Sequence, residues 1–178
     1  MIVFISGGAR SGKSHVAEQT ALSLARKNSG QLYYLATAKR SDDEMVERIL
    51  IHQQDRGETW ITIEEPYYLE EYLMNCEKDD VVLIDCLTIW LSNVMFEMND
   101  KMTKLEEMVR EWIRVARKKQ FSLVIVSNEV NGGIPFLDEA VFSYMYTLQK
   151  LHQLIVEQAE LSVEVQAGIP TYWKGEKE

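Results

Sequence analysis

The chain has 178 residues, of which 46% are hydrophobic and 26% charged, a balance that is ordinary for a globular protein and excludes a disordered chain. Its length predicts a single domain over residues 1–178. The formal net charge of −9 excludes nucleic acid as a partner, because an acidic surface repels a phosphate backbone. Any phosphate site must therefore be local and built from main-chain amides and a few cations.

In chain order, short apolar runs alternate with stretches of helical periodicity. The expected elements are a strand at Ile2–Ser6, a helix at Ser14–Lys27, a strand at Leu32–Ala36, a helix from Asp42 to about Gln54, a strand at Trp60–Ile63, a helix at Leu69–Cys76, a strand at Val81–Ile84, a helix starting near Leu87, a helix at Thr103–Lys119, a strand at Leu123–Val126, a helix at Val141–Ala159 and a strand at Leu161–Gln166. The polar residues Lys174–Glu178 are expected to form a frayed tail. This alternation predicts a mostly parallel, twisted sheet with helices on both faces.

No apolar run approaches the ~20 residues that a membrane span needs. The apolar start Met1–Ser6 is short and lacks the basic region of a signal peptide. We therefore expect a cytoplasmic protein without a membrane span. The two cysteines, Cys76 and Cys86, do not have the spacing of a metal site, and we expect them to be reduced and mostly buried.

The first predicted strand runs into a glycine-rich segment that fits the P-loop pattern G-x-x-x-x-G-K-[ST] at every fixed position. The segment is Gly7-Gly8-Ala9-Arg10-Ser11-Gly12-Lys13-Ser14. Its glycines let successive N–H groups point inward around phosphate oxygens, and the following helix offers its N-terminal dipole to the same anion. We predict that these eight residues bind a nucleoside triphosphate, with Lys13 as the catalytic cation on the β- and γ-phosphates and the Ser14 hydroxyl on Mg²⁺. The fold class expected from this motif is α/β of the P-loop NTPase type.

An acidic group for the metal is also expected, and in P-loop proteins it usually closes a buried apolar strand. Asp85 directly follows the apolar run Val81–Ile84, so we predict that it binds Mg²⁺ or a water of the metal. A solvated strand end, or an N-cap of the helix that starts near Leu87, would give the same pattern.

Further segments follow the P-loop in a characteristic order. They are Tyr34-Leu35-Ala36-Thr37-Ala38, Asp42-Asp43-Glu44-Met45, Arg48-Ile49 with His52, Arg56-Gly57 with Trp60, Thr62 and Glu64, Ile84-Asp85-Cys86-Leu87-Thr88 with Trp90-Leu91-Ser92-Asn93, and Val126-Ser127-Asn128-Glu129-Val130. In order and spacing this set resembles the bifunctional adenosylcobinamide kinase / adenosylcobinamide-phosphate guanylyltransferase family of cobalamin assembly. The resemblance is dense from residue 1 to about residue 133.

The resemblance implies a two-step activity. A nucleoside triphosphate, ATP or GTP, first phosphorylates the hydroxyl of the aminopropanol arm of adenosylcobinamide. GTP then donates GMP to adenosylcobinamide phosphate through a GMP-histidine intermediate, and pyrophosphate is released. The match places the intermediate on His52, and the nucleotide contacts that it implies beyond the P-loop are Ala36, Thr37, Ala38, Arg48, Glu64 and Asp85. It also implies a homo-oligomer, with a trimer as the specific expectation.

The residues around His52 are compatible with this role. His52 lies on the predicted helix that opens with the capping box Ser41-Asp42-Asp43-Glu44, and Arg48 lies one turn earlier on the same face. A neutral imidazole nitrogen is a competent nucleophile toward phosphorus, and a neighbouring cation favours the neutral form. His52 also shares a helical stripe with Met45 and Ile49, so without the resemblance a structural residue at the edge of the core would be the more natural interpretation.

The resemblance weakens in the last third of the chain. The family usually continues its Asn-Glu-Val segment with Gly-x-Gly-Ile-Val-Pro, whereas this chain is one residue shorter, at Asn131-Gly132-Gly133-Ile134-Pro135. The next helix typically carries an Arg-Asp pair and an Asn-Gln pair, and the matching positions here are Met145-Tyr146 and His152-Gln153. The segment Ala167-Gly168-Ile169-Pro170 agrees with the family again. Whether both activities are kept is left open by these differences.

Two other functions are compatible with the residues. One is a P-loop kinase for another small alcohol, in which His52 has only a structural role. The other is a non-catalytic nucleotide sensor that acts through a partner, for which the aromatic helix segment Phe142–Tyr146 is a candidate surface.

Overall fold

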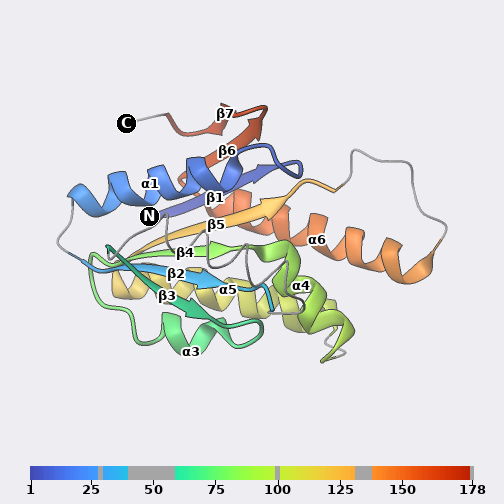
Figure 1. Ribbon diagram of the computed structural model, residues 1–178. Helices are drawn as coiled ribbons and strands as arrows, with labels where there is room; N and C mark the ends of the chain where they lie inside the picture. The colour runs from blue at the N-terminus through green and yellow to red at the C-terminus, as the bar shows by residue number, and fades with distance from the viewer. Residues whose placement is uncertain (28–29, 40–58, 99–100, 131–137, 177–178) are drawn as a thin grey trace.

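The computed structural model describes residues 1–27, 30–39, 59–98, 101–130 and 138–176 (Figure 1). Its elements are β1 (Ile2–Gly7), α1 (Lys13–Lys27), β2 (Leu32–Ala36), β3 (Trp60–Glu64), α3 (Leu69–Leu73), β4 (Val81–Asp85), α4 (Leu87–Phe96), α5 (Met102–Lys119), β5 (Ser122–Asn128), α6 (Glu139–Gln158), β6 (Leu161–Gln166) and β7 (Ile169–Lys174). None of the helices in the described part of the chain has the length and apolar character of a membrane span.

The seven strands form one sheet in the order β3-β2-β4-β5-β1-β6-β7. Every neighbouring pair is parallel except β6 and β7, which are antiparallel. The carboxyl ends of β1 to β6 therefore meet at one edge of the sheet, where Figure 1 shows their arrowheads pointing the same way. Ligands of open α/β sheets bind outside this edge.

Strand periodicity divides the core into two layers. In β1, Ile2 and Phe4 point to one face of the sheet, and Val3 and Ile5 point to the other. The first face packs against α3, α4, α5 and α6, and the second packs against α1 (Figure 1). The mostly parallel sheet with helices on both faces is confirmed, and with it the near-continuous apolar runs that such a sheet requires.

The largest difference from the expected elements is the last strand. Ile169–Lys174 form β7 against β6, where only a polar tail from Lys174 was expected. The two strands are joined by a two-residue turn in which Ala167 and Gly168 have φ of 49° and 81°, the positive values that a tight hairpin turn requires. Pro170 is tolerated because β7 is an edge strand, whose outer side needs no hydrogen-bond donor.

Two helix ends differ from expectation by more than one residue. The α3 helix ends at Leu73 instead of Cys76. The α6 helix begins at Glu139, two residues earlier than expected, because the Asp138 side chain accepts hydrogen bonds from the amides of Ala140 and Val141. The helix expected from Asp42 to about Gln54 lies outside the described residues.

Candidate functional site

The P-loop lies at the carboxyl edge, between the end of β1 at Gly7 and the start of α1 at Lys13. The Ser11 N–H donates to the Gly8 carbonyl at 3.2 Å, so the chain turns tightly. Arg10 and Gly12 have φ of 57° and 89°, in the left-handed region, and alternation of this kind turns successive N–H groups toward one centre. The loop therefore has the main-chain form of an anion cradle at a helix N-terminus.

Close packing around the loop explains two of its glycines. A Cβ on Gly7 would lie 2.4 Å from the Val165 carbonyl oxygen of β6 and 2.6 Å from Ser11 Oγ, whereas a Cβ on Gly8 would meet no atom within 4 Å. On Gly12 a Cβ would lie 3.3 Å from the Cα of Gly168. Gly7 is thus required by space, and Gly12 is required by its positive φ as well as by its close neighbour.

The β6–β7 turn supports the loop from outside. The Gly168 N–H donates to the Ser11 carbonyl at 2.8 Å, so the hairpin and the P-loop are joined directly. The sequence pattern assigned no role to this contact, although the run Ala167-Gly168 between two β-rich segments was a signal for a hairpin.

Lys13 and Ser14 follow the glycines into the first turn of α1. Lys13 is only 8% exposed, and its Nζ donates to the Gly8 carbonyl at 3.1 Å. Ser14 is half-buried. Ser11 Oγ is buried beside Gly7 and has no hydrogen-bond partner among the described residues. The Lys13 ammonium is the charged donor of the loop, and such a group suits phosphate oxygens.

Asp85 closes β4 on the same face of the sheet as α1. It is two residues beyond Leu83, which packs in the α1 layer of the core. The Tyr34 hydroxyl donates to Asp85 Oδ2 at 2.7 Å and orients the carboxylate. Only β5 separates β4 from β1, so the two strand ends are roughly 10 Å apart. The structure therefore brings Asp85 to the carboxyl edge of the sheet on the same face as the P-loop helix α1.

Thr37 braces the end of β4. Its hydroxyl donates to the Cys86 carbonyl at 2.9 Å and accepts from the Cys86 N–H at 2.8 Å. The Asn93 amide nitrogen donates to the Thr37 carbonyl at 3.0 Å. The side chain of Thr37 is fully buried, and Ala36 before it is buried while Ala38 after it is half-buried. Of these three residues, only Ala38 is partly exposed.

Glu64 lies far from the P-loop along the sheet. It pairs with Ala36 at the end of β3, and three strands separate β3 from β1. Four strand spacings amount to roughly 19 Å, so Glu64 cannot contact phosphates in the loop. Its contact with a nucleotide stays a prediction. Arg48 and His52 lie outside the described residues, and their roles stay predictions.

Neither cysteine is a candidate nucleophile. Cys76 and Cys86 are buried and free, as expected. Burial raises the pKa of Cys76 to about 12 and that of Cys86 to about 11, so both remain thiols at neutral pH. No cluster of three or more His, Cys, Asp or Glu side chains placed for a metal occurs in the described ranges. A metal here would depend on few protein ligands together with phosphate oxygens, as Mg²⁺ in nucleotide sites usually does.

Behind the P-loop lies a polar group of residues that sequence reasoning did not identify. Ser127 Oγ lies 2.7 Å from His152 Nε2 and 3.1 Å from Thr88 Oγ1, which accepts from the Asn128 N–H at 2.7 Å. Burial lowers the pKa of His152 from its ordinary 6.5 to about 4, against a weaker opposing effect of Glu129. The imidazole is therefore neutral at physiological pH.

Acid should destabilise the protein through His152. An unfolded histidine takes up a proton near pH 6.5, whereas the folded one stays neutral down to about pH 4, so the unfolded state binds more protons between these values and stability is lost as the pH falls through them. Between about pH 7.5 and about pH 5, His152 should account for about 2 kcal/mol of the lost free energy of unfolding. Urea denaturation at both pH values should show a loss smaller by that amount in His152→Gln. Equal losses in the two proteins would contradict the assignment.

Comparisons with known proteins agree on one family. The family model described as cobinamide kinase / cobinamide phosphate guanyltransferase matches residues 3–172. The chain is 36% identical over 173 residues to the bifunctional adenosylcobalamin biosynthesis protein CobP of Pseudomonas aeruginosa, covering 97% of this chain and 96% of that protein. It is 33% identical over 146 residues to the bifunctional adenosylcobalamin biosynthesis protein CobU of Escherichia coli K12, covering 75% of this chain and 78% of that protein.

Solved structures with little sequence identity share the fold. The flagellar accessory protein FlaH of Methanocaldococcus jannaschii is 12% identical with a TM-score of 0.56, over 98% of this chain and 78% of that chain. The KaiC-like protein PH0186 of Pyrococcus horikoshii OT3 is 11% identical with a TM-score of 0.57, over 99% of this chain and 79% of that chain. The P-loop NTPase type of fold, expected from the motif, is thereby confirmed.

Proposed function

The chain belongs to the cobinamide kinase / cobinamide phosphate guanyltransferase family, and from this membership we propose that it is a transferase with both activities. It phosphorylates the hydroxyl of adenosylcobinamide with ATP or GTP, and then joins GMP from GTP to adenosylcobinamide phosphate. The observation that supports this most strongly is the P-loop cradle, with the Lys13 ammonium donating to its Gly8 carbonyl and the Asp85 carboxylate on the same side of the sheet.

In the kinase step, the chain binds the triphosphate and neutralises charge on the γ-phosphoryl group as it moves to the substrate oxygen. The main-chain amides of Gly8–Lys13 and the Lys13 ammonium supply this stabilisation. The bond between the γ-phosphorus and the β–γ bridging oxygen breaks as the bond to the alcohol oxygen forms, the nucleoside diphosphate leaves with the electron pair, and the alcohol proton is released to solvent. The Ser14 hydroxyl and the Asp85 carboxylate are hard oxygen donors of the kind that Mg²⁺ prefers, and they would hold the metal. When bound, Mg²⁺ would offset charge on the β- and γ-phosphates.

In the guanylyl step, we assign the nucleophile to His52 and a phosphate contact to Arg48. A neutral imidazole nitrogen attacks the α-phosphorus of GTP, the nitrogen–phosphorus bond forms, and pyrophosphate leaves with the electron pair. The phosphate of adenosylcobinamide phosphate then displaces the histidine from the guanylyl group. The base end of the nucleotide extends toward β2 and β3, where Ala36 and Glu64 end the two strands and Thr37 and Ala38 follow β2.

Three further expectations complete the proposal. Residues 1–178 act as one domain, the protein is cytoplasmic, and copies of the chain associate into a homo-oligomer, with a trimer as the specific expectation. Subunit contacts are therefore expected to contribute to the complete enzyme.

The decisive experiment is incubation with GTP and Mg²⁺ followed by intact-mass measurement. Wild-type protein should gain one guanylyl group, through an adduct that is labile in acid and stable in alkali. His52→Ala should gain none, because no other imidazole takes over the attack, while His15→Ala, which changes an exposed histidine beside the P-loop, should be labelled like the wild type.

The other outcomes separate the alternative functions. Transfer of only the γ-phosphate, with no adduct on wild-type protein, would support a P-loop kinase for another small alcohol. Nucleotide binding without turnover of adenosylcobinamide or its phosphate would support a non-catalytic sensor. Labelling of His52→Ala equal to that of the wild type would remove His52 from the mechanism.

A further inference from the structure

A chain of hydrogen-bonded groups runs from α6 to the carboxyl edge of the sheet. It starts at His152 on α6, passes through Ser127 near the end of β5 and Thr88 in the first turn of α4, and ends at the main-chain N–H of Asn128. The three contacts measure 2.7, 3.1 and 2.7 Å. Ser127 is 0% exposed and Thr88 is 7% exposed, so the chain of contacts is shielded from water along most of its length.

The end of this chain lies between the two halves of the nucleotide site. The N–H of Asn128 donates to Thr88 on α4, the helix that begins two residues after Asp85. The next N–H, that of Glu129, donates to the carbonyl of Gly7 at 2.9 Å. Two successive amides at the end of β5 therefore hold the Asp85 side of the site and the first residue of the P-loop. A shift of this peptide would change the separation between them.

The N–H of Asn128 can only donate, so Thr88 Oγ1 accepts from it. The hydroxyls then relay in one direction when Thr88 donates to Ser127 Oγ and Ser127 donates to an unprotonated Nε2 of the neutral His152 imidazole. Hydrogen bonds that point the same way strengthen one another. A protonated imidazole would donate to Ser127 and reverse this order.

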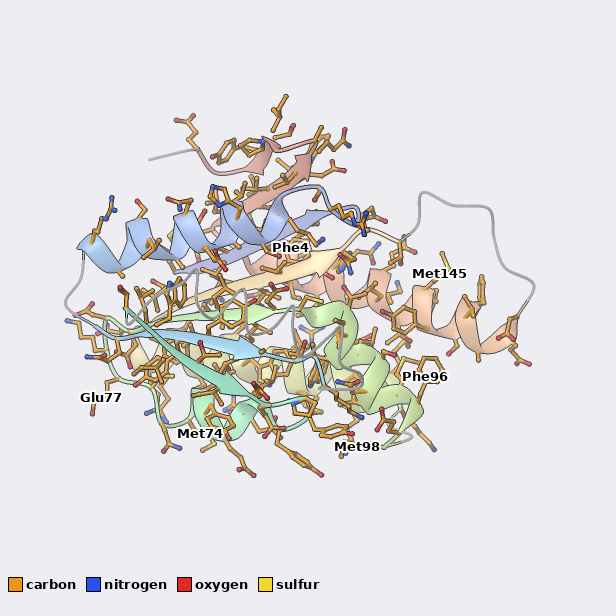
Figure 2. The ribbon with its side chains drawn as sticks, in the orientation of Figure 1. Phe4, Met74, Glu77, Phe96, Met98 and Met145 are labelled. Carbon is orange, nitrogen blue, oxygen red and sulfur yellow. The ribbon has the colours of Figure 1, made fainter. Side chains whose placement is uncertain are left out.

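The surroundings of His152 favour the neutral ring. The Phe4 ring, labelled in Figure 2, lies with its centroid 5.0 Å from that of His152. The charged group that acts on the imidazole is Glu129, at the end of β5. Desolvation lowers the pKa of the imidazole by more than this carboxylate raises it, so the ring stays neutral.

We propose that His152, acting through Ser127 and Thr88, is a positioning residue that fixes the Asn128 amide and with it the spacing between the P-loop and Asp85. A nucleophilic Ser–His pair is excluded, because the fully buried Ser127 hydroxyl cannot reach a substrate. The role in turnover rests on the proposed kinase activity, whereas the role in fixing the amide does not.

Hydrogen exchange of the Asn128 amide tests the positioning without any substrate. In His152→Leu this amide should exchange about ten-fold faster than in the wild type, because the bond to Thr88 loses its supporting partner. Ile125, in the middle of β5, should be unaffected. His152→Gln should restore slow exchange, since its amide oxygen can accept from Ser127 and does not titrate. Unchanged exchange in His152→Leu, or equal acceleration in His152→Gln, would overturn the proposal.

Kinetics of the kinase step give the second readout. In His152→Leu and in Ser127→Ala, kcat should fall about ten-fold while the dissociation constant of the nucleotide stays within about three-fold, because misplaced groups affect the transition state more than binding. His152→Gln should keep kcat within about three-fold of the wild type. Should His152→Leu fail to fold, Ser127→Ala still decides the matter. An unchanged kcat in folded Ser127→Ala would refute the role in turnover, whereas a wild type without kinase activity would refute the proposed function and leave the exchange result standing.

Discussion

Replacing Lys13 with alanine should lower kcat for phosphorylation of adenosylcobinamide by about a hundred- to a thousand-fold, the loss typical of removing one preorganised group that stabilises transition-state charge. The ammonium of Lys13 is 8% exposed and lies 3.1 Å from the Gly8 carbonyl, so it is held in place before the nucleotide arrives. Because this cation is already in position, the protein need not rearrange when the phosphoryl group is transferred. No other lysine lies on the P-loop to replace it.

The measurement is single-turnover transfer of the γ-phosphate with saturating nucleotide. His15→Ala provides the matched control, because His15 is exposed on the same turn of α1 and should leave the rate within about two-fold, as is usual for surface substitutions. A Lys13→Ala protein that folds normally and transfers phosphate at the wild-type rate would show that the P-loop is not the kinase site.

Much of the fold could be predicted because local patterns and long-range packing agree. The strand, loop and helix around Gly7–Ser14 follow from one motif and from the apolar run before it. The β4 and β5 strands follow from apolar runs that are buried on both faces. In a parallel sheet, such runs have few alternatives, and the helices between them set the parallel direction.

The β7 strand could not be predicted as easily. Ile169–Lys174 contains Pro170, which argues against a central strand, and its turn uses Ala167 with a positive φ instead of the usual asparagine or aspartate. Its stability comes from pairing with β6 and from the contact of Gly168 with the P-loop. The contact of Gly168 with Ser11 joins residues 157 positions apart (168 − 11) and leaves no trace in a local pattern.

In the candidate site, too, some features follow from the local sequence and others depend on the fold. The P-loop and Asp85 are set by motif and strand position, and the structure brings them to one side of the sheet. The distance of Glu64 from the loop depends on the strand order, which places β2, β4 and β5 between β3 and β1. The sequence identified His152 only as a histidine within a predicted helix. Its contact with Ser127 exists because α6 packs across β5 and β1.

Alanine at Gly7 should destabilise the protein, whereas alanine at Gly8 should not. Neither glycine has a positive φ, so an alanine at either position causes little backbone strain. The two positions differ only in the room that they leave for a Cβ atom. A Cβ at position 7 would lie 2.4 Å from the main-chain oxygen of Val165, which cannot move without displacing β6, while a Cβ at position 8 meets nothing within 4 Å. Gly7→Ala should lose about 3 kcal/mol of unfolding free energy, at the upper end of overpacking costs, and Gly8→Ala should stay within about 0.5 kcal/mol.

Urea denaturation without nucleotide measures both changes. Because the clash at Gly7 is with β6, relief requires the β6–β7 hairpin to move away from the loop, and the Gly168 amide that donates to Ser11 should lose protection from hydrogen exchange in Gly7→Ala alone. Equal stability of the two variants would mean that β6 does not lie against the loop as the structure places it. In that case the last hairpin would not support the P-loop either, because the predicted clash at Gly7 and the contact of Gly168 with Ser11 depend on the same close approach of the hairpin to the loop.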